Sequence, residues 1–298
     1  MFLVVTSVFL ILRSGPQDPA QFILGDFATA ETIRNLQVRM GLDKPIYVQY
    51  VSFIKSIAAG DFGRSYLNNE TVLSQVAAVL PYTLELVVAA LIVGLLIGIP
   101  PGIVCAVRFN GVFDHLLRLL TLVGISIPVF VLGIFLIQIF SLKLNLLPAI
   151  GGGDLTDIKS RWNHLVLPAL SCGIMMWASI TRLTRASLLD VLGRDFIRTA
   201  RAKGLREILV VCKHGLRNAL MPLVTFLGIY VNILLGSAVL TEVIFTRPGI
   251  GRLVIEGIKS SDFPIVQTMI MFYAGAVVIV NLLIDILYCI IDPRIVHK

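Results

Sequence analysis

Long apolar runs separated by short polar segments dominate this chain of 298 residues. A helix that crosses the hydrocarbon core of a bilayer needs about 20 mostly apolar residues. Five stretches satisfy this requirement, at about 80–107, 116–141, 164–181, 219–245 and 265–291. A sixth apolar stretch, residues 1–12, reaches only about 18 Å, because a helix rises 1.5 Å per residue. We expect it to be the end of a first membrane helix whose true start lies upstream of Met1.

The composition supports a membrane protein. Hydrophobic residues make up 57% of the chain and charged residues only 14%, and the mean hydropathy is +0.90. Soluble domains are nearer half apolar and a quarter charged. The predicted fold class is therefore an all-α integral membrane protein with about six transmembrane helices. The net charge of +7 is better explained by cytoplasmic loops than by nucleic-acid binding, so we expect membrane lipid and no nucleic acid as a partner.

The distribution of Lys and Arg predicts the orientation of the chain. Segment 182–218 holds nine basic residues against three acidic ones, whereas segment 13–78 holds six of each sign. By the positive-inside rule, 182–218 faces the cytoplasm and 13–78 faces outward. The region 79–291 then forms the membrane domain, and the tail 292–298 is cytoplasmic. The outer segments contain helix signals at about Thr29–Met40 and Tyr47–Ala59, and TRPGIGRL (246–253) leads into a short amphipathic helix.

The cytoplasmic segment contains a short amphipathic helix at 195–203, DFIRTARAK. Its apolar face carries Phe196, Ile197 and Ala200. Its basic face carries Arg198, Arg201 and Lys203. Gly204 is expected to end this helix, and Ala200 and Ala202 keep it slim enough to approach another surface closely. Physical chemistry alone leaves two alternatives open: a docking element for a soluble partner, or an interfacial helix held by anionic headgroups.

Polar residues inside the spans are the remaining candidates for function. Asn232 lies in the middle of its span, and Asn281 and Asp285 lie four residues apart on one helical face. Each either lines a translocation pathway or forms hydrogen bonds between helices, as small and polar residues in membranes commonly do. The glycines and prolines of segment 94–102 are expected to kink the helix or allow close packing.

The sequence contains no arrangement typical of an enzyme or a metal centre. The four cysteines and four histidines are scattered, and there is no HExxH motif and no usable Ser/Lys or Ser/His pair. The phosphate-binding motif GxxxxGK[ST] is also absent. We therefore expect no catalytic, cofactor-binding or metal-binding residue in this chain, and any ATP hydrolysis that drives it must take place on another polypeptide.

Several motifs, in order along nearly the whole chain, resemble one family. They are GLDKPIYVQY (41–50), GDFGRS (60–65), TLEL (83–86), DFIRTARAKGL (195–205), HGLRNALMP (214–222), TEVIFTRPGIGRL (241–253), DFPIVQ (262–267) and NLLIDILYCIIDPRI (281–295). The chain thus resembles the permeases of bacterial ABC importers of the peptide/nickel type, the dipeptide and oligopeptide permease B proteins. Within the wider EAA motif of such permeases only Ala200 and Gly204 match, the proline is displaced to Pro222, and SGPQDPA (14–20) has Gln17 where the family has glycine.

This resemblance favours the docking interpretation of the cytoplasmic helix. It implies a permease in the bacterial inner membrane that forms half of a translocation pathway with a second homologous permease subunit. A periplasmic solute-binding protein would deliver the solute, and two cytoplasmic ATPase subunits would bind ATP and Mg²⁺. The implied ATPase-coupling residues are Asp195, Phe196, Ile197, Arg198, Thr199, Ala200, Arg201, Ala202, Lys203 and Gly204.

Two other transport mechanisms remain as alternatives at this point. A secondary transporter driven by protons would use Asp285 or Glu85 as a relay, and its uptake would be sensitive to a protonophore but independent of any ATPase. A channel would leave the slim cytoplasmic helix without a role. The solute stays open among dipeptides, longer peptides, nickel chelates, glutathione and small glycosides, because a binding protein outside this sequence would select it.

Overall fold

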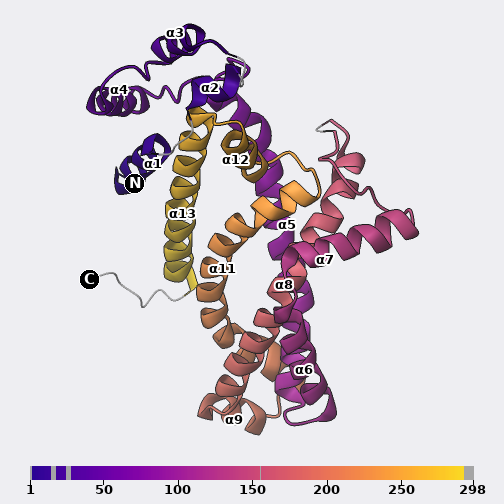
Figure 1. Cartoon of the computed structure of the whole chain (residues 1–298). Coiled ribbons are helices and arrows are strands. Elements are labelled where there is room, and N and C mark those ends of the chain that lie inside the picture. The colour runs from indigo at the N-terminus through magenta and orange to yellow at the C-terminus, as the bar shows by residue number, and fades with distance from the viewer. Residues whose placement is uncertain (1, 15–17, 25–27, 155, 292–298) are drawn as a thin grey trace. The chain divides into compact units, whose positions relative to one another are not determined.

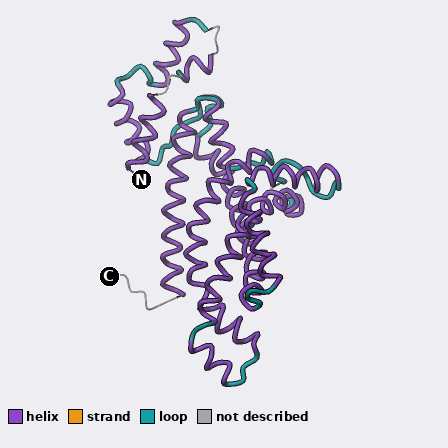
Figure 2. Tube along the Cα trace, turned by 60° about the horizontal axis from the view of Figure 1, so that its bottom comes forward, coloured by secondary structure: helices purple, strands orange, loops and turns teal. Residues whose placement is uncertain are grey.

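A computed structural model provides the structure of the chain and describes residues 2–14, 18–24, 28–154 and 156–291. Regular secondary structure in these residues is helical, apart from an isolated β-bridge between Arg64 and Thr71 (Figures 1 and 2). The helices are α1 (Phe2–Ser14), α2 (Pro19–Leu24), α3 (Ala30–Met40), α4 (Ile46–Ala58), α5 (Val72–Val107), α6 (Val112–Ser126), α7 (Val129–Leu136), α8 (Ile158–Leu192), α9 (Asp195–Ala202), α10 (Glu207–Leu209), α11 (Arg217–Ile244), α12 (Ile250–Lys259) and α13 (Phe263–Ile291), with π-helical segments η1 (Ile137–Lys143) and η2 (Val210–Leu216).

The all-helical fold class is confirmed, but six spans are not observed. Within the described residues four helical stretches are long and apolar enough to cross a membrane: Val72–Val107, Ile158–Leu192, Glu207–Ile244 and Phe263–Leu287. The stretch predicted as a span at 116–141 is not one continuous helix, because Val112–Ser126 and Val129–Lys143 are bent by 97° relative to each other. Counted together they would make a fifth span. Phe2–Arg13 is apolar but shorter, and the predicted tail 292–298 lies outside the described residues.

The bend has a local cause at Pro128. The proline ring disfavours the helical conformation of the residue before it, and its nitrogen has no hydrogen to donate. Ile127 is accordingly extended, with φ −88° and ψ 121°, and Pro128 becomes the residue that precedes α7. The apolar pattern continues through this point, which is why it predicts one span where the backbone forms two helices.

Both helices that flank the predicted cytoplasmic segment are longer than their apolar runs. Residues 182–192 continue α8, and residues 207–216 form α10 and η2 before α11 begins at Arg217. Arginine is a good helix former, so a change from apolar to basic residues does not end a helix. The other short-helix predictions are confirmed in α3, α4 and α12, and Thr29 caps α3 by accepting a hydrogen bond from the Thr32 amide.

The described chain divides into two compact units. Unit 1 comprises residues 1–81 and 248–278, and unit 2 comprises residues 82–247 and 279–298. In unit 1, Val72 and Val76 of α5 pack with Ile250 of α12 and with Ile265 and Met269 of α13. These residues form its principal apolar cluster.

Two separated sequence motifs meet in unit 1. The fully buried Asp262, which precedes α13, accepts hydrogen bonds from the Ser65 hydroxyl at 2.6 Å and the Tyr66 amide at 3.1 Å. The Thr268 hydroxyl donates to the Phe62 carbonyl at 3.2 Å. The segments GDFGRS and DFPIVQ, with Tyr66 and Thr268 that directly follow them, are therefore tied together by hydrogen bonds from both side chains and backbone. Both motifs therefore help to hold unit 1 together, a role that their positions in the sequence do not reveal.

In unit 2, α8 packs against α6, α7 and α11, and α5 lies against it through a stripe of glycines. A Cβ atom added at Gly94, Gly98 or Gly102 would meet side chains of α8, namely Met176, Ile180 and Thr184. The Thr181 hydroxyl donates to the Gly98 carbonyl at 3.1 Å, which also requires a close approach of the two backbones. The expected packing role of this glycine stripe is confirmed, and it is the small-xxx-small pattern of membrane helix pairs.

A Gly98→Val variant should destabilise unit 2 through overpacking. A Cβ at Gly98 would lie 2.7 Å from Ile180 Cγ2 and 2.9 Å from Ile180 Cβ, so the helices must separate. We expect a loss of about 1–3 kcal/mol in the free energy of unfolding, measured in detergent. Gly236→Val is the matched control, because no atom lies within 4 Å of a Cβ at Gly236. Equal stability of the two variants would contradict the packing assignment.

Candidate functional site

The helix predicted to dock onto a partner is α9, and one of its faces is anchored within unit 2. Ile197 is fully buried and Ala200 is 8% exposed. They join a cluster formed mainly by α8, η2 and α11, whose other buried members are Ala106, Leu188, Val191, Val210, Val211 and Ala219. This cluster fixes the buried face of α9 against η2 and places it beside residues of α8 and α11.

The opposite face of α9 is exposed. Its exposed residues are Asp195, Phe196, Arg198, Thr199, Arg201 and Ala202, and the exposed surface continues through Lys203 and Gly204. Arg201 pairs with Glu207 at 2.7 Å, and Arg198 lies 3.4 Å from Asp195. These pairs are solvent-exposed and contribute little to stability. The exposed face of α9 is therefore charged, and small residues, Ala202 and Gly204, lie at its C-terminal end.

Two details of the predicted helix need correction. Phe196 does not share the buried face of Ile197; it is 43% exposed and lines a groove of about 310 Å³ with Asp190, Arg194 and Pro222. Ala200 is buried in the molecule's own core, so it does not provide a slim surface for a partner. A 100° turn per residue places Phe196 at the margin of the apolar stripe, where pattern alone does not decide its burial.

Gly204 ends the helical segment as predicted, although α9 itself stops at Ala202. Its φ is +75°, a conformation that side chains with a Cβ rarely adopt, and no atom lies within 4 Å of where a Cβ would be. The Leu205 amide closes the end by donating to the Ala200 carbonyl at 3.4 Å. Ala202 and Gly204 are therefore the exposed small residues of this segment.

Of the three polar residues predicted within the spans, Asn232 and Asn281 are in contact with each other. Asn232 of α11 donates from its Nδ2 to Asn281 Oδ1 of α13 at 3.2 Å and to the Gly228 carbonyl at 3.3 Å. Gly228 lets the helices approach, because a Cβ there would collide with Ile284. The arrangement supports the inter-helix role for Asn232 and Asn281. Asp285 is exposed on α13, and its role stays a prediction.

An Asn281→Leu variant should have a small effect on stability. Inter-helix hydrogen bonds in membranes average about 0.6 kcal/mol, and Asn232 keeps its bond to Gly228 after the change. We expect a loss of that order in thermal unfolding, with the rate of solute uptake unchanged. A large loss of uptake at normal protein levels would instead indicate that Asn281 lines the pathway.

A buried charge network at one end of unit 2 was not predicted. Arg247, which is fully buried after α11, donates to Glu85 Oε2 of α5 at 3.1 Å, and Arg161 of α8 forms an ion pair with the same carboxylate. Both guanidinium groups face the ring of Tyr82, at 5.2 Å for Arg161 and 5.3 Å for Arg247. Burial lowers the pKa of Arg247, and the charges of Glu85 and Glu242 oppose that shift. The network ties the start of α8 and the segment after α11 to the middle of α5.

A hydrogen bond between Thr83 and Glu242 lies beside this charge network and also joins α5 to α11. The Thr83 hydroxyl donates to Glu242 Oε1 at 2.6 Å, and both residues are almost completely buried. The Tyr82 hydroxyl donates to the Gly153 carbonyl at 3.3 Å. The segments TLEL and TEVIFTRPGIGRL thus meet through their polar residues. A signal was present in the sequence, since charged residues directly beside apolar runs require partners.

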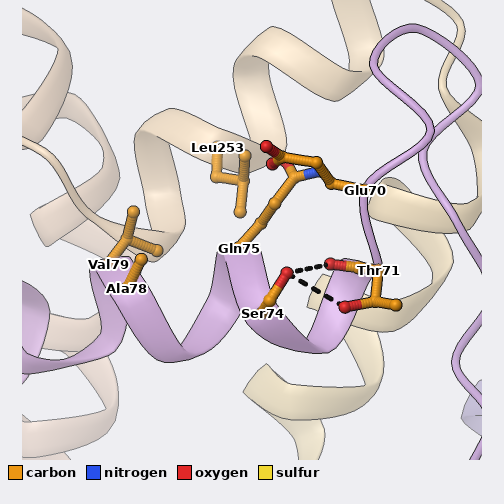
Figure 3. Close-up of a pocket in the computed structure, with 7 residues that line it drawn as sticks. All are labelled: Glu70, Thr71, Ser74, Gln75, Ala78, Val79 and Leu253. Carbon is orange, nitrogen blue, oxygen red and sulfur yellow. Dashed lines mark hydrogen bonds between the residues drawn. The ribbon is translucent and has the colours of Figure 1, made fainter.

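Unit 1 has a separate open pocket of about 410 Å³ between α5 and α12 (Figure 3). It is lined by Glu70, Thr71, Ser74, Gln75, Ala78, Val79 and Leu253. The Ser74 hydroxyl donates to the Thr71 carbonyl at 2.8 Å, and the Thr71 hydroxyl donates to Ser74 Oγ at 2.9 Å. The two hydroxyl groups of the pocket thus bond to each other and to the backbone.

Comparisons with known proteins identify the family. Residues 98–297 match the family described as the inner membrane component of binding-protein-dependent transport systems, and residues 1–87 match the N-terminal family of such components. The chain belongs to this family. It is a permease subunit of a binding-protein-dependent ABC importer, a multi-pass protein of the inner membrane and not an enzyme. The family predicted from the motifs is thereby confirmed.

Individual relatives agree over the full chain. The glutathione transport system permease protein GsiC of Shigella flexneri serotype 5b is 39% identical over 298 residues, which is 100% of this chain and 95% of the relative. GsiC of Escherichia coli K12 gives the same values. Among solved structures, an inward-facing conformation of the MetNI methionine ABC transporter has a TM-score of 0.60 at 19% identity. The match covers 74% of this chain and 97% of that one and supports the fold.

Proposed function

We propose that this permease forms half of the translocation pathway of an ATP-driven importer. The other half would be a second, homologous permease subunit. Two cytoplasmic ATPase subunits would bind ATP and Mg²⁺, and a periplasmic solute-binding protein would deliver the solute to the outer segments. The absence of a GxxxxGK[ST] motif from the sequence supports this division of labour, because the chain lacks the usual phosphate-binding loop.

The exposed face of α9 is the part that would contact an ATPase subunit. The observation that supports this role best is the two-sided character of α9: Ile197 and Ala200 are anchored in unit 2, while Thr199 and Ala202 are exposed. An interfacial lipid-binding helix would instead direct its apolar side chains at the membrane. The buried residues Ile197 and Ala200 act as anchors within the proposed coupling segment and would not touch the partner.

The solute is proposed to be a short peptide or a peptide-like molecule, with glutathione as the first candidate. The relatives that match the whole chain at 39% identity are named as glutathione permeases. Such solutes carry both amino and carboxylate groups. The outer segments would receive them from the binding protein, which would carry most of the selectivity.

The cargo is tested by uptake in cells that lack this permease. Deletion should reduce the uptake of radiolabelled glutathione or of a labelled dipeptide, and expression of the chain should restore it. Loss of the ATPase subunits should have the same effect, whereas a protonophore that spares cellular ATP should not. Unchanged uptake of both solutes would refute the proposed cargo. Uptake that is abolished by the protonophore but unaffected by loss of the ATPase subunits would favour proton coupling.

A further inference from the structure

Unit 2 contains a basic pocket that the proposed coupling and transport roles do not use. It is formed by α6, α8 and α11, has a volume of about 620 Å³, and is hereafter called the arginine pocket. The residues that define it are Arg118, Thr121, Ser179, Arg182, Arg185 and Phe226. A volume of this size falls within the usual range of ligand sites, about 300–1,000 Å³.

The positive charge of the arginine pocket is only partly neutralised. Arg185 binds the fully buried Asp114 in a bidentate manner, at 2.6 and 2.8 Å. Arg118 lies 3.8 Å from the same carboxylate, and its Nη2 is 2.6 Å from His115 Nδ1. Arg182 makes no hydrogen bond or ion pair with any residue that the structure describes. Three arginines against one carboxylate leave two positive charges for a ligand.

The pocket lies at the depth of a membrane surface. On α8, Arg161 and Arg182 are 21 residues apart, which corresponds to about 31 Å along a helix. The hydrocarbon core is about 30 Å thick, and the residues between them are mostly apolar. The two arginines therefore bracket the core. The positive-inside rule assigns the end with Arg182 to the cytoplasmic side, so the pocket faces the headgroups of the inner leaflet.

The surroundings of the pocket favour a ligand with an apolar tail. On α6, the side chains of Leu119, Leu122 and Val123 are 63%, 57% and 61% exposed, and Leu122 also lines the pocket. Phe226 of α11 adds an aromatic face. A soluble anion would use only the guanidinium groups, whereas a phospholipid would cover this apolar surface as well.

We propose that the arginine pocket binds the headgroup of an anionic phospholipid of the cytoplasmic leaflet. Its phosphate accepts hydrogen bonds from Arg118 and Arg182, and the Ser179 hydroxyl provides a further donor. The acyl chains lie along the exposed leucines of α6. Basic pockets between membrane helices on the cytoplasmic side recognise such headgroups. The inference depends on the membrane position of the chain and is independent of its cargo.

The proposal is tested by native mass spectrometry of the purified full-length chain. Phosphatidylglycerol should bind with a stoichiometry of one lipid per chain, and more tightly than zwitterionic phosphatidylcholine. Each arginine near a membrane surface contributes roughly a fivefold change in affinity for anionic lipid. Arg182→Gln should therefore weaken phosphatidylglycerol binding about fivefold, and Arg118→Gln with Arg182→Gln about 25-fold. Arg182→Lys should retain most of the binding.

Two controls show whether the lipid binds specifically at the arginine pocket. Arg206→Gln removes one exposed basic charge outside the pocket and should leave binding unchanged. Equal weakening by Arg206→Gln and Arg182→Gln would overturn the site. Glycerol phosphate at the same concentration should not displace the lipid; displacement would identify a site for soluble anions and overturn the lipid assignment.

A second measurement identifies what occupies the pocket in the cell. Photoreactive benzoylphenylalanine placed at Phe226 should yield adducts of phospholipid mass in native membranes. Capture of another polypeptide at that position would instead show that a partner subunit covers the pocket, and would overturn the lipid assignment.

Discussion

An Arg247→Met variant is expected to lose about 1.5–3 kcal/mol of stability, because it removes the charge-assisted hydrogen bond from a buried guanidinium group to Glu85. Arg247 is fully buried, donates to Glu85, and lies against the Tyr82 ring. Methionine has an unbranched side chain that fills much of the same space, so the loss of charge and not a cavity determines the effect. We expect a large drop in the unfolding temperature in detergent and little protein in the membrane.

The matched control is the same substitution at an exposed ion pair. Arg194 is 61% exposed and pairs with Asp190, so Arg194→Met should change stability by less than about 1 kcal/mol. A second variant that combines Arg247→Met with Glu85→Gln should be less stable than Arg247→Met alone, since Arg161 then also loses its charged partner. Similar losses for Arg247→Met and Arg194→Met would show that the network is not a structural centre of unit 2.

An Ala202→Arg variant should reduce solute uptake about tenfold or more while the protein remains folded in the membrane. Ala202 is exposed and lies on the face of α9 proposed to meet the ATPase subunit. An arginine there introduces bulk and an unpaired charge into a close contact, and 1.4 kcal/mol of lost binding already corresponds to a factor of ten. Uptake rate per unit of membrane protein is the measurement.

A suitable control for Ala202→Arg is an arginine substitution at another exposed residue. Val112→Arg places the same charge at the first residue of α6, which is 86% exposed and outside the proposed contact, and it should transport normally. Ala200→Arg is not an informative test of docking, because Ala200 lies in the apolar cluster and its replacement would also destabilise unit 2. Normal uptake by Ala202→Arg would remove this face of α9 from the coupling contact.

The sequence was sufficient to predict the fold class, the family and the short helices α3, α4, α9 and α12. Apolar runs of span length and helix-ending residues such as Gly204 are local signals, and local signals can be read without a structure. The bend before α7 was missed because Ile127 and Pro128 lie inside a continuous apolar run. A proline in a membrane helix is often tolerated, so its presence alone does not predict a break.

The candidate site was predictable only in the parts that depend on residues adjacent in sequence. The helix α9 was found, whereas the division between its anchored and exposed residues depends on contacts with η2 and α11. Glu85 is 76 positions from Arg161 and 162 positions from Arg247 along the chain. No periodic sequence pattern connects residues so far apart, so their contact was not predictable. The sequence left open whether Asn232 and Asn281 line a pathway or bond between helices, and their mutual hydrogen bond is seen only in the structure.

The central claim is that the exposed face of α9 contacts a nucleotide-hydrolysing subunit, and photo-crosslinking from Thr199 tests it most directly. Thr199 is exposed and lies outside the apolar cluster, so a photoreactive residue there does not disturb the fold. In membranes of cells that import the solute, we expect irradiation to capture an ATPase subunit, with a yield that changes when ATP is depleted. Capture of lipid alone under the same conditions would contradict the account.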